Sequence, residues 1–258
     1  MKHNVKKTEI IAIANQKGGV GKTTTAINLG AALSIAEKKV LLVDFDPQAN
    51  TTTGLGYDKH NIEKDIYAVL TSSFSINDIK ISTDLKYLDI VPSSRNLARF
   101  EFEIAEDDTS YMFLKNVLKE VDGEYDYILI DSPPSLGLLT INALSAADSV
   151  LIPIQAEYYA LEGLTDLVNT IERIKENFNG GLKIKGIVLT MYDERTNLSK
   201  QVEQEVREYF KTNVYSSIIP RNVRLSEAPS YGRPIQLYDI KSSGSKAYMK
   251  LAKEILTK

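Results

Sequence analysis

The chain has 258 residues, of which 43% are hydrophobic and 25% are charged, a balance typical of a globular protein that can bury a substantial core. It contains no cysteine, which excludes disulfides, thiol catalysis and cysteine-ligated iron–sulfur or zinc sites. No apolar run approaches the roughly 20 residues of a membrane-spanning helix, and the basic N-terminus lacks a small-residue cleavage site, so we expect neither a membrane span nor a signal peptide.

The net charge of −3 is distributed unevenly along the chain. From Arg195 to the C-terminus there are 12 lysines and arginines against 6 aspartates and glutamates, a net charge of +6, whereas the preceding residues carry −9. Such an asymmetry can mark a surface for nucleic acid or for an acidic membrane. It can equally be a solvated basic face, and charge alone leaves both interpretations open.

Short apolar runs alternate with amphipathic stretches throughout the chain. The runs that predict buried strands are residues 10–14, 40–45, 87–91, 127–130, 150–154, 184–190 and 214–219. The stretches with helical spacing are residues 24–36, 111–121, 161–178, 198–210 and 243–258. This alternation predicts an α/β fold with a mostly parallel twisted sheet and helices on both faces. Because there is no Pro/Gly/Ser-rich linker and no internal repeat, we expect residues 1–258 to form a single domain.

The last of these stretches has an apolar face bordered by lysines, as in a helix that lies on a membrane. That face is narrow and contains neither Phe nor Trp. We therefore expect it to be the final helix covering the sheet.

The first strand leads into a loop with the sequence KGGVGKT and then into a helix, the context of a phosphate-binding loop. Glycines allow backbone N–H groups to close around phosphate oxygens, and the helix N-terminus adds free donors. Lys22 supplies a positive charge to the β- and γ-phosphates, and the Thr23 hydroxyl can bind Mg²⁺. A glycine turn without function is the weaker alternative. The expected nucleotide contacts are Lys17, Gly18, Gly19, Val20, Gly21, Lys22, Thr23 and Thr24.

Aspartates follow two of the predicted strands. Asp44 and Asp46 stand two residues apart at the end of the second strand, so both carboxylates reach the edge of the sheet where ligands bind in such folds. We expect Asp44 to lie in the magnesium shell and Asp46 to position or activate the attacking water. Asp131 ends a later strand at the position of a Walker B aspartate, which holds Mg²⁺ through water. The predicted metal site is therefore Thr23, Asp44 and Asp131.

The loop departs from the general pattern GxxxxGK[ST], because Gln16 stands at the first glycine and Lys17 follows it. KGGVGKTTTAINLGAAL resembles the deviant Walker A ATPases of the ParA/MinD superfamily, in which the additional lysine is the signature. The resemblance implies that Lys17 takes part in catalysis with Lys22 and Asp46, by reaching the phosphates of the other subunit in a nucleotide-sandwich dimer.

Further motifs are similar to the chromosomal ParA (Soj) branch and extend over nearly the whole chain. They are, in order, NQKGGVGKTTTAINLG, DFDPQANTTTGLG, DYILIDSPPSLGLLTINAL, LTMYDERTNLSKQV and IIPRNVRLSEAPSYGRPI. The resemblance implies ATP and Mg²⁺ as cofactors, a homodimer that forms on ATP binding and binds double-stranded DNA without sequence preference, and a ParB-like partner that stimulates hydrolysis. It further implies chromosome or plasmid segregation in the cytoplasm, at the nucleoid.

The resemblance also implies where DNA and the adenine base bind. The family's DNA-contacting arginines align with Arg195 and Arg224, both inside the basic C-terminal third. Weaker candidates for the same surface are Lys200, Arg221, Arg233, Lys246 and Lys250. The adenine is expected beside Met191, Pro220 and Asn222. No NKxD string is present, so a Ras-like guanine loop is not expected.

Other functional classes fit the sequence less well. A MinD-type membrane-cycling regulator needs a C-terminal anchor with larger apolar residues than LAKEILTK offers. Reductases similar to the nitrogenase iron protein need cysteines for a shared cluster. An amidating or carboxylating enzyme with a phosphate loop needs a second substrate site, and none is evident in the sequence. A non-hydrolysing binding module would require Asp46 to be inert.

Overall fold

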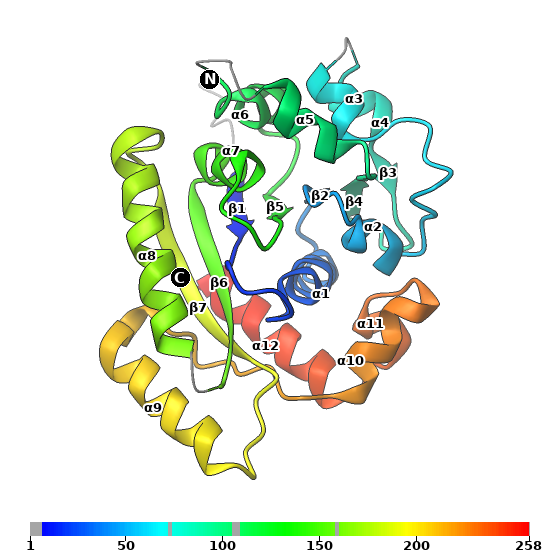
Figure 1. Cartoon of the computed structure of the whole chain (residues 1–258). Coiled ribbons are helices and arrows are strands. Elements are labelled where there is room, and N and C mark those ends of the chain that lie inside the picture. Colours follow the sequence, from blue (N-terminus) through cyan, green and yellow to red (C-terminus); the bar gives the residue numbers. More distant parts are fainter. Residues whose placement is uncertain (1–6, 72–73, 105–108, 158–159, 258) are drawn as a thin grey trace, which may run out of the picture.

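A computed structural model describes residues 7–71, 74–104, 109–157 and 160–257 of the chain. Within these residues, seven strands form one sheet in the order β3-β4-β2-β5-β1-β6-β7 (Figure 1). β3 is antiparallel to β4, and the other neighbouring strands are parallel. The strands are β1 (Glu9–Ile13), β2 (Val40–Asp44), β3 (Ile81–Ser82), β4 (Leu88–Val91), β5 (Tyr127–Asp131), β6 (Ser149–Gln155) and β7 (Lys183–Thr190).

Helices of very different length connect these strands. The α-helices are α1 (Lys22–Ile35), α2 (Asn50–Gly54), α3 (Ile66–Thr71), α4 (Ile76–Ile79), α5 (Leu97–Glu103), α6 (Phe113–Leu118), α7 (Leu138–Ala146), α8 (Ala160–Asn177), α9 (Asn197–Phe210), α10 (Val223–Glu227), α11 (Ile235–Tyr238) and α12 (Ser243–Thr257). Short 3₁₀ helices span Lys119–Val121, Lys211–Asn213 and Ala228–Tyr231.

Different helices cover the two faces of the sheet. In β2, which is buried at every position, Val40 and Leu42 belong to the core shared with α1 and α12, whereas Leu41 and Val43 belong to the core shared with α3 to α7. Helices α8 and α9 extend the second layer over β6 and β7 (Figure 1). Burial on both faces explains why the strands are apolar nearly from end to end. The predicted fold class is confirmed.

The carboxyl ends of three parallel strands meet where the phosphate loop begins. The chain leaves β1, passes through α1 and enters β2, and β5 lies between those two strands. Asp131, the last residue of β5, is in register with Ile13 of β1 and with Asp44 of β2. The topology therefore brings the loop and both strand-end aspartates to one edge of the sheet.

One predicted strand is wrong. Residues 214–219 lie beside β7 and donate two backbone hydrogen bonds to it, Tyr215 to Ile187 and Ile219 to Leu189, but they form only an isolated bridge, Ile187 with Val214, and no strand. The ladder is interrupted because the donors Tyr215 and Ile219 are four residues apart, whereas their acceptors Ile187 and Leu189 are only two apart, so the pairing loses its regular spacing. The N–H of Ser216, between these donors, donates to the carboxylate of Glu254 in α12 at 2.9 Å. The other six predicted strands are present, with ends that differ by at most one residue.

The C-terminal stretch is the last helix, α12, and it lies in the core on one face of the sheet, where it packs against α1. Its residues Tyr248, Leu251 and Ile255 are buried in the core, and the Tyr248 hydroxyl lies 3.1 Å from the Thr25 hydroxyl of α1. No helix in the described ranges is both long enough and apolar enough to span a bilayer.

Candidate functional site

The phosphate loop is held open by glycine geometry and anchored on both sides. Gly19 and Gly21 have φ values of +76° and +90°, in the left-handed region that disfavours a side chain. Gly21 precedes α1 without a side-chain cap, which leaves the first N–H groups of that helix available for an anion. The loop is tied to β6 by the Asn15 amide, which donates to the Pro153 carbonyl at 2.8 Å. It is tied to β7 by the Thr190 hydroxyl, which donates to the Val20 carbonyl at 2.8 Å.

The two loop lysines occupy different environments. Lys22 is only 7% exposed, and its Nζ donates to the Lys17 carbonyl at 3.0 Å, so the ammonium lies inside the loop. Burial lowers its pKa, and the charges of Asp131 and Asp46 partly oppose that shift. The Lys17 ammonium is exposed and forms an ion pair with Glu157 of its own chain at 2.8 Å.

Asp131 is buried at the end of β5, and its two carboxylate oxygens are used differently. The hydroxyls of Thr23 and Thr51 each donate to Oδ2, at 2.8 Å. Oδ1 is buried without a hydrogen-bond partner among the described residues. Burial raises the pKa of this carboxyl to about 6. An unpaired buried oxygen is costly unless a ligand, ion or water satisfies it, so this atom points to a binding site.

Asp44 is also fully buried. Its Oδ2 accepts hydrogen bonds from the backbone N–H of Thr52 at 2.7 Å and from the Thr52 hydroxyl at 2.6 Å. Burial, followed by the nearby charge of Asp131, raises the Asp44 pKa to about 7. The two buried carboxylates thus lie close enough to repel each other when both are ionised. A divalent cation would relieve that repulsion.

The residues at this edge fit magnesium better than a metal held entirely by protein. The structure brings Thr23, Asp44 and Asp131 together, which amounts to one hydroxyl and two carboxylates. Across the described ranges there is no cluster of three or more His, Cys, Asp or Glu side chains arranged to hold a metal. Mg²⁺ usually takes one or two carboxylates and fills its remaining positions with waters and substrate phosphates.

Asp46 lies just beyond the end of β2 at the same edge. It is 7% exposed, and its Oδ1 accepts a hydrogen bond from the backbone N–H of Gln48 at 2.9 Å. Its Oδ2 accepts no hydrogen bond from the described residues, and the side chain reaches the surface. A carboxylate oxygen in this position is able to accept a hydrogen bond from a water.

A cavity of about 310 Å³ lies between the phosphate loop and the C-terminal segment, and Met191, Pro220 and Asn222 all line it. Met191 follows β7 with a φ of +47°, an uncommon conformation for a residue with a side chain. The Asn222 amide donates to the Ser243 hydroxyl at 2.6 Å. Because Gly19, Gly21 and Thr24 line the same cavity, the three residues expected around the base open directly onto the loop.

The two arginines expected to contact DNA lie on neighbouring segments but are not free of partners. Arg195 is 84% exposed and pairs with Asp193 at 2.7 Å, and Arg224 is 55% exposed and pairs with Glu227 at 2.8 Å. The bridge between Tyr192 and Pro220 joins the two segments that carry them. Of the weaker candidates, Arg221 lines the base cavity, and Arg233 lines a crevice beside α1 and α2.

Three buried hydroxyl residues belong to the site although the sequence does not single them out. Thr51 and Thr52 of α2 bond to Asp131 and Asp44, and Ser93, after β4, bonds to Thr52 and to the backbone of Asp46. The run of threonines after Asp46 is a signal that could have identified the first two. Ser93 has no such signal, because it is far from the motifs in sequence.

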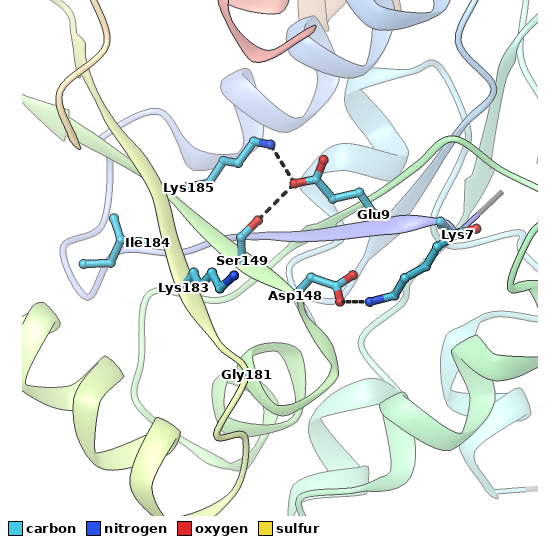
Figure 2. A pocket seen from close by; sticks show the side chains of 9 residues that line it. Lys7, Glu9, Asp148, Ser149, Gly181, Lys183, Ile184 and Lys185 are labelled. Atoms are coloured by element: carbon cyan, nitrogen blue, oxygen red, sulfur yellow. Dashed lines mark hydrogen bonds and ion pairs between the residues drawn. The ribbon is translucent and has the colours of Figure 1, made fainter. Parts of the chain in front are cut away.

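A larger cavity, about 670 Å³, lies at the opposite end of β1, β6 and β7 (Figure 2). Figure 2 shows that its carboxylates are already neutralised: Lys7 pairs with Asp148 at 2.8 Å, and Lys185 pairs with Glu9 at 2.7 Å. No buried polar atom there lacks a partner among the described residues. Size alone therefore does not make this cavity a candidate site.

Comparison with known proteins agrees with this geometry. A family model described as an AAA domain matches residues 8–184. The chain is 54% identical to the chromosome partitioning protein ParA of Myxococcus xanthus over 96% of this chain and 87% of that protein. It is also 54% identical to the sporulation initiation inhibitor protein Soj of Bacillus subtilis, over 96% of this chain and 98% of that protein.

A solved structure extends the comparison. Cobyrinic acid a,c-diamide synthase from Mycobacterium smegmatis, determined with bound ADP and magnesium, superposes with a TM-score of 0.85 at 35% identity, over 96% of this chain and 94% of that one. Together with the match to relatives along almost its whole length, this leads to one conclusion: the chain belongs to the ParA/Soj family of chromosome-partitioning ATPases.

Proposed function

We propose that this protein is an ATP-hydrolysing DNA-partitioning protein in which residues 1–258 act as one ATPase domain. The observation that carries the proposal is the convergence of Lys22, Thr23, Asp44, Asp46 and Asp131 at one edge of the sheet. One buried oxygen of Asp131 has no hydrogen-bond partner in the part of the chain that the structure describes. This arrangement suits a nucleotide with a divalent cation better than any other class of ligand.

Each element of the site has a defined part in binding. The N–H groups of the phosphate loop and of the N-terminus of α1 surround the phosphates, and the buried Lys22 ammonium neutralises their charge. Thr23 would bind Mg²⁺ directly, and Asp44 and Asp131 would hold it through water. When bound, the ion offsets negative charge on the β- and γ-phosphates. The relative from Mycobacterium smegmatis, which was solved with ADP and magnesium, supports this assignment.

Asp46 is the residue proposed to position the attacking water. Its backbone is fixed beside Asp44, and its Oδ2 carries no hydrogen bond from the described residues. Holding a water in line with the γ-phosphate contributes to hydrolysis because it removes the orientational cost of the reaction. The base cavity beside Met191, Pro220 and Asn222 would hold the adenine.

Assembly and partners form the second half of the proposal. In an ATP-bound homodimer the Lys17 ammonium would exchange Glu157 for the phosphates bound by the partner subunit. Arg195 and Arg224 would then contact phosphates of double-stranded DNA without reading its sequence. A ParB-like protein would stimulate hydrolysis and release the dimer, and DNA binding would place the protein in the cytoplasm at the nucleoid. The names of the Myxococcus and Bacillus relatives support a partitioning role.

The MinD-type alternative, a regulator that cycles on a membrane, receives less support. Most apolar residues of α12 are buried in the core shared with α1, and Met249 and Leu256 pack partly buried against it, so no wide apolar face is left for a lipid surface. The exposed part of that helix is polar and carries Lys246, Lys250 and Lys253.

Co-sedimentation separates these two functions. The purified protein is mixed with duplex DNA or with anionic liposomes, each with ATP and Mg²⁺, with ADP and without nucleotide. We expect ATP-dependent recovery with DNA of two unrelated sequences and none with liposomes. Recovery with liposomes alone would favour the MinD-type function, and no ATP turnover in any mixture would reject the ATPase.

A further inference from the structure

The acidic residues of the site are held by a chain of buried hydroxyl groups. Thr52 and Ser93 are both fully buried, on α2 and after β4 respectively. Among the described residues, neither side chain forms a hydrogen bond with the phosphate loop. Their hydrogen bonds lead instead to Asp44 and Asp46.

The direction of the hydrogen bonds can be assigned from chemistry alone. The backbone N–H of Ser93 can only donate, and it donates to the Thr52 hydroxyl oxygen at 3.0 Å. The single proton of that hydroxyl is therefore directed at Asp44 Oδ2, 2.6 Å away. The backbone N–H of Thr52 donates to the same oxygen at 2.7 Å. Two donors from one residue fix the plane of the Asp44 carboxylate.

The same network reaches the backbone of Asp46 from both sides. The backbone N–H of Asp46 donates to Asp44 Oδ1 at 3.3 Å, and its carbonyl accepts from the Ser93 hydroxyl at 3.0 Å. Asp46 lies beyond the last residue of β2, so the sheet ladder does not hold it. Its carbonyl also accepts from the Ala49 N–H at 2.8 Å. The remaining backbone bonds of Asp46 come from Asp44 and Ser93, and both of these residues bond to Thr52.

We infer that Thr52, anchored by Ser93, is a positioning residue for ATP hydrolysis. It orients the carboxylate of Asp44 and, through Asp44 and Ser93, the backbone of Asp46. The inference rests on the proposed roles of Asp44 and Asp46. Groups that orient metal-site and catalytic carboxylates typically contribute about 10- to 100-fold to activity or metal affinity. Nucleotide affinity without metal comes mainly from the loop and Lys22, which belong to another segment.

The test compares Thr52→Val, which keeps the shape and removes the hydroxyl, with Thr52→Ser, which keeps the hydroxyl. For each full-length variant, kcat and KM for ATP are measured together with the unfolding temperature. A second readout uses a fluorescent ADP analogue, whose affinity for the protein is measured at increasing Mg²⁺. The Mg²⁺ concentration that gives half of the full increase in affinity is the Mg²⁺ requirement. Ser93→Ala is the second variant, because it removes only the bond to the Asp46 carbonyl and leaves the Ser93 N–H in place.

We expect Thr52→Val to lower kcat about 10- to 100-fold and to raise the Mg²⁺ requirement about 10-fold, while KM for ATP changes little. In Thr52→Ser both kcat and the Mg²⁺ requirement should stay close to wild type. Ser93→Ala should lower kcat and leave the Mg²⁺ requirement unchanged. Turnover by Thr52→Val within about twofold of wild type, or equal damage in Thr52→Ser, would overturn the inference. If Thr52→Val does not fold, Ser93→Ala decides, and wild-type turnover in it would overturn the inference.

Asp46→Ala in the same assays separates this inference from the function on which it rests. Wild-type turnover in Asp46→Ala would reject the proposed role of Asp46. Loss of turnover in Asp46→Ala, with full turnover in Thr52→Val, would reject only the positioning role.

Discussion

The nucleotide edge and the basic C-terminal third carry charge in opposite ways. Asp44 and Asp131 are buried and oriented by threonine hydroxyls, whereas Arg195 and Arg224 are exposed and pair with carboxylates a few residues away. A buried charge is held rigidly because leaving it unpaired is costly. An exposed ion pair contributes only about 0–1 kcal/mol and exchanges partners readily. The nucleotide edge is therefore preorganised for chemistry. The arginines of the basic C-terminal third can exchange their neighbouring carboxylates for phosphates.

The two regions meet at a backbone contact between two glycines. Gly56 follows α2, whose threonines donate hydrogen bonds to Asp44 and Asp131. Gly232 ends the 3₁₀ helix that continues from α10. A Cβ on Gly232 would lie 2.4 Å from the Gly56 Cα. The basic segment thus rests directly on the segment that orients the carboxylates.

The largest effect is expected from Lys22→Ala, which removes the buried positive charge of the loop. We expect nucleotide affinity to fall about 100-fold or more, since truncating a buried charge that pairs with phosphate costs about 2–5 kcal/mol. Lys17→Ala is the matched control: its side chain is exposed, so the monomer should still bind nucleotide while ATP-driven dimerisation is impaired. Titration with a fluorescent nucleotide and light scattering measure the two properties. Equal nucleotide affinity in Lys22→Ala and wild type would contradict the assignment of the loop.

An intermediate effect is expected where the two regions touch. Gly232 has a φ of +63°, so Gly232→Ala both strains the backbone and drives a methyl group into Gly56. We expect the free energy of unfolding to fall by about 1–3 kcal/mol, measured by urea denaturation. Gly163→Ala in α8 is the control, because nothing lies within 4 Å of its Cβ position. That change should stabilise the helix by up to about 1 kcal/mol. A neutral Gly232→Ala would show that the contact is loose.

The smallest effects are expected for single arginines of the basic surface. Arg195→Ala and Arg224→Ala should weaken DNA binding alike on unrelated sequences and should lower the slope of log affinity against log salt by about 0.9 for each phosphate that is no longer neutralised. ATP turnover without DNA should be unchanged. Glu227→Gln removes the nearer of the two carboxylates that pair with Arg224 and should leave DNA binding equal or stronger. Gel shifts over a salt series measure these changes, and wild-type binding by both arginine variants would place the DNA surface elsewhere.

Features that depend on local spacing could be predicted from the sequence. The glycine loop, the apolar strands and the aspartates at their ends are local features, and parallel topology brings them to one edge. Features that depend on contacts between distant residues could not be predicted in this way. Ser93 reaches Asp46 across 47 positions, and the Ser216 N–H, in a segment expected to be a strand, donates to Glu254 across 38. The pairing of Arg195 with Asp193 was equally unforeseen, although it is local, because exposed side chains choose among several neighbours.

A rapid-mixing measurement on Asp46→Ala tests the central claim most directly. The variant and wild type are mixed with radiolabelled ATP and Mg²⁺, and bound ATP and released phosphate are followed in the same samples. The account predicts that the variant binds ATP with an affinity within about threefold of wild type and releases phosphate at least about 100-fold more slowly, because the loop and Lys22 bind the phosphates and the Asp46 carboxylate positions the water. Phosphate release within about twofold of wild type would contradict it.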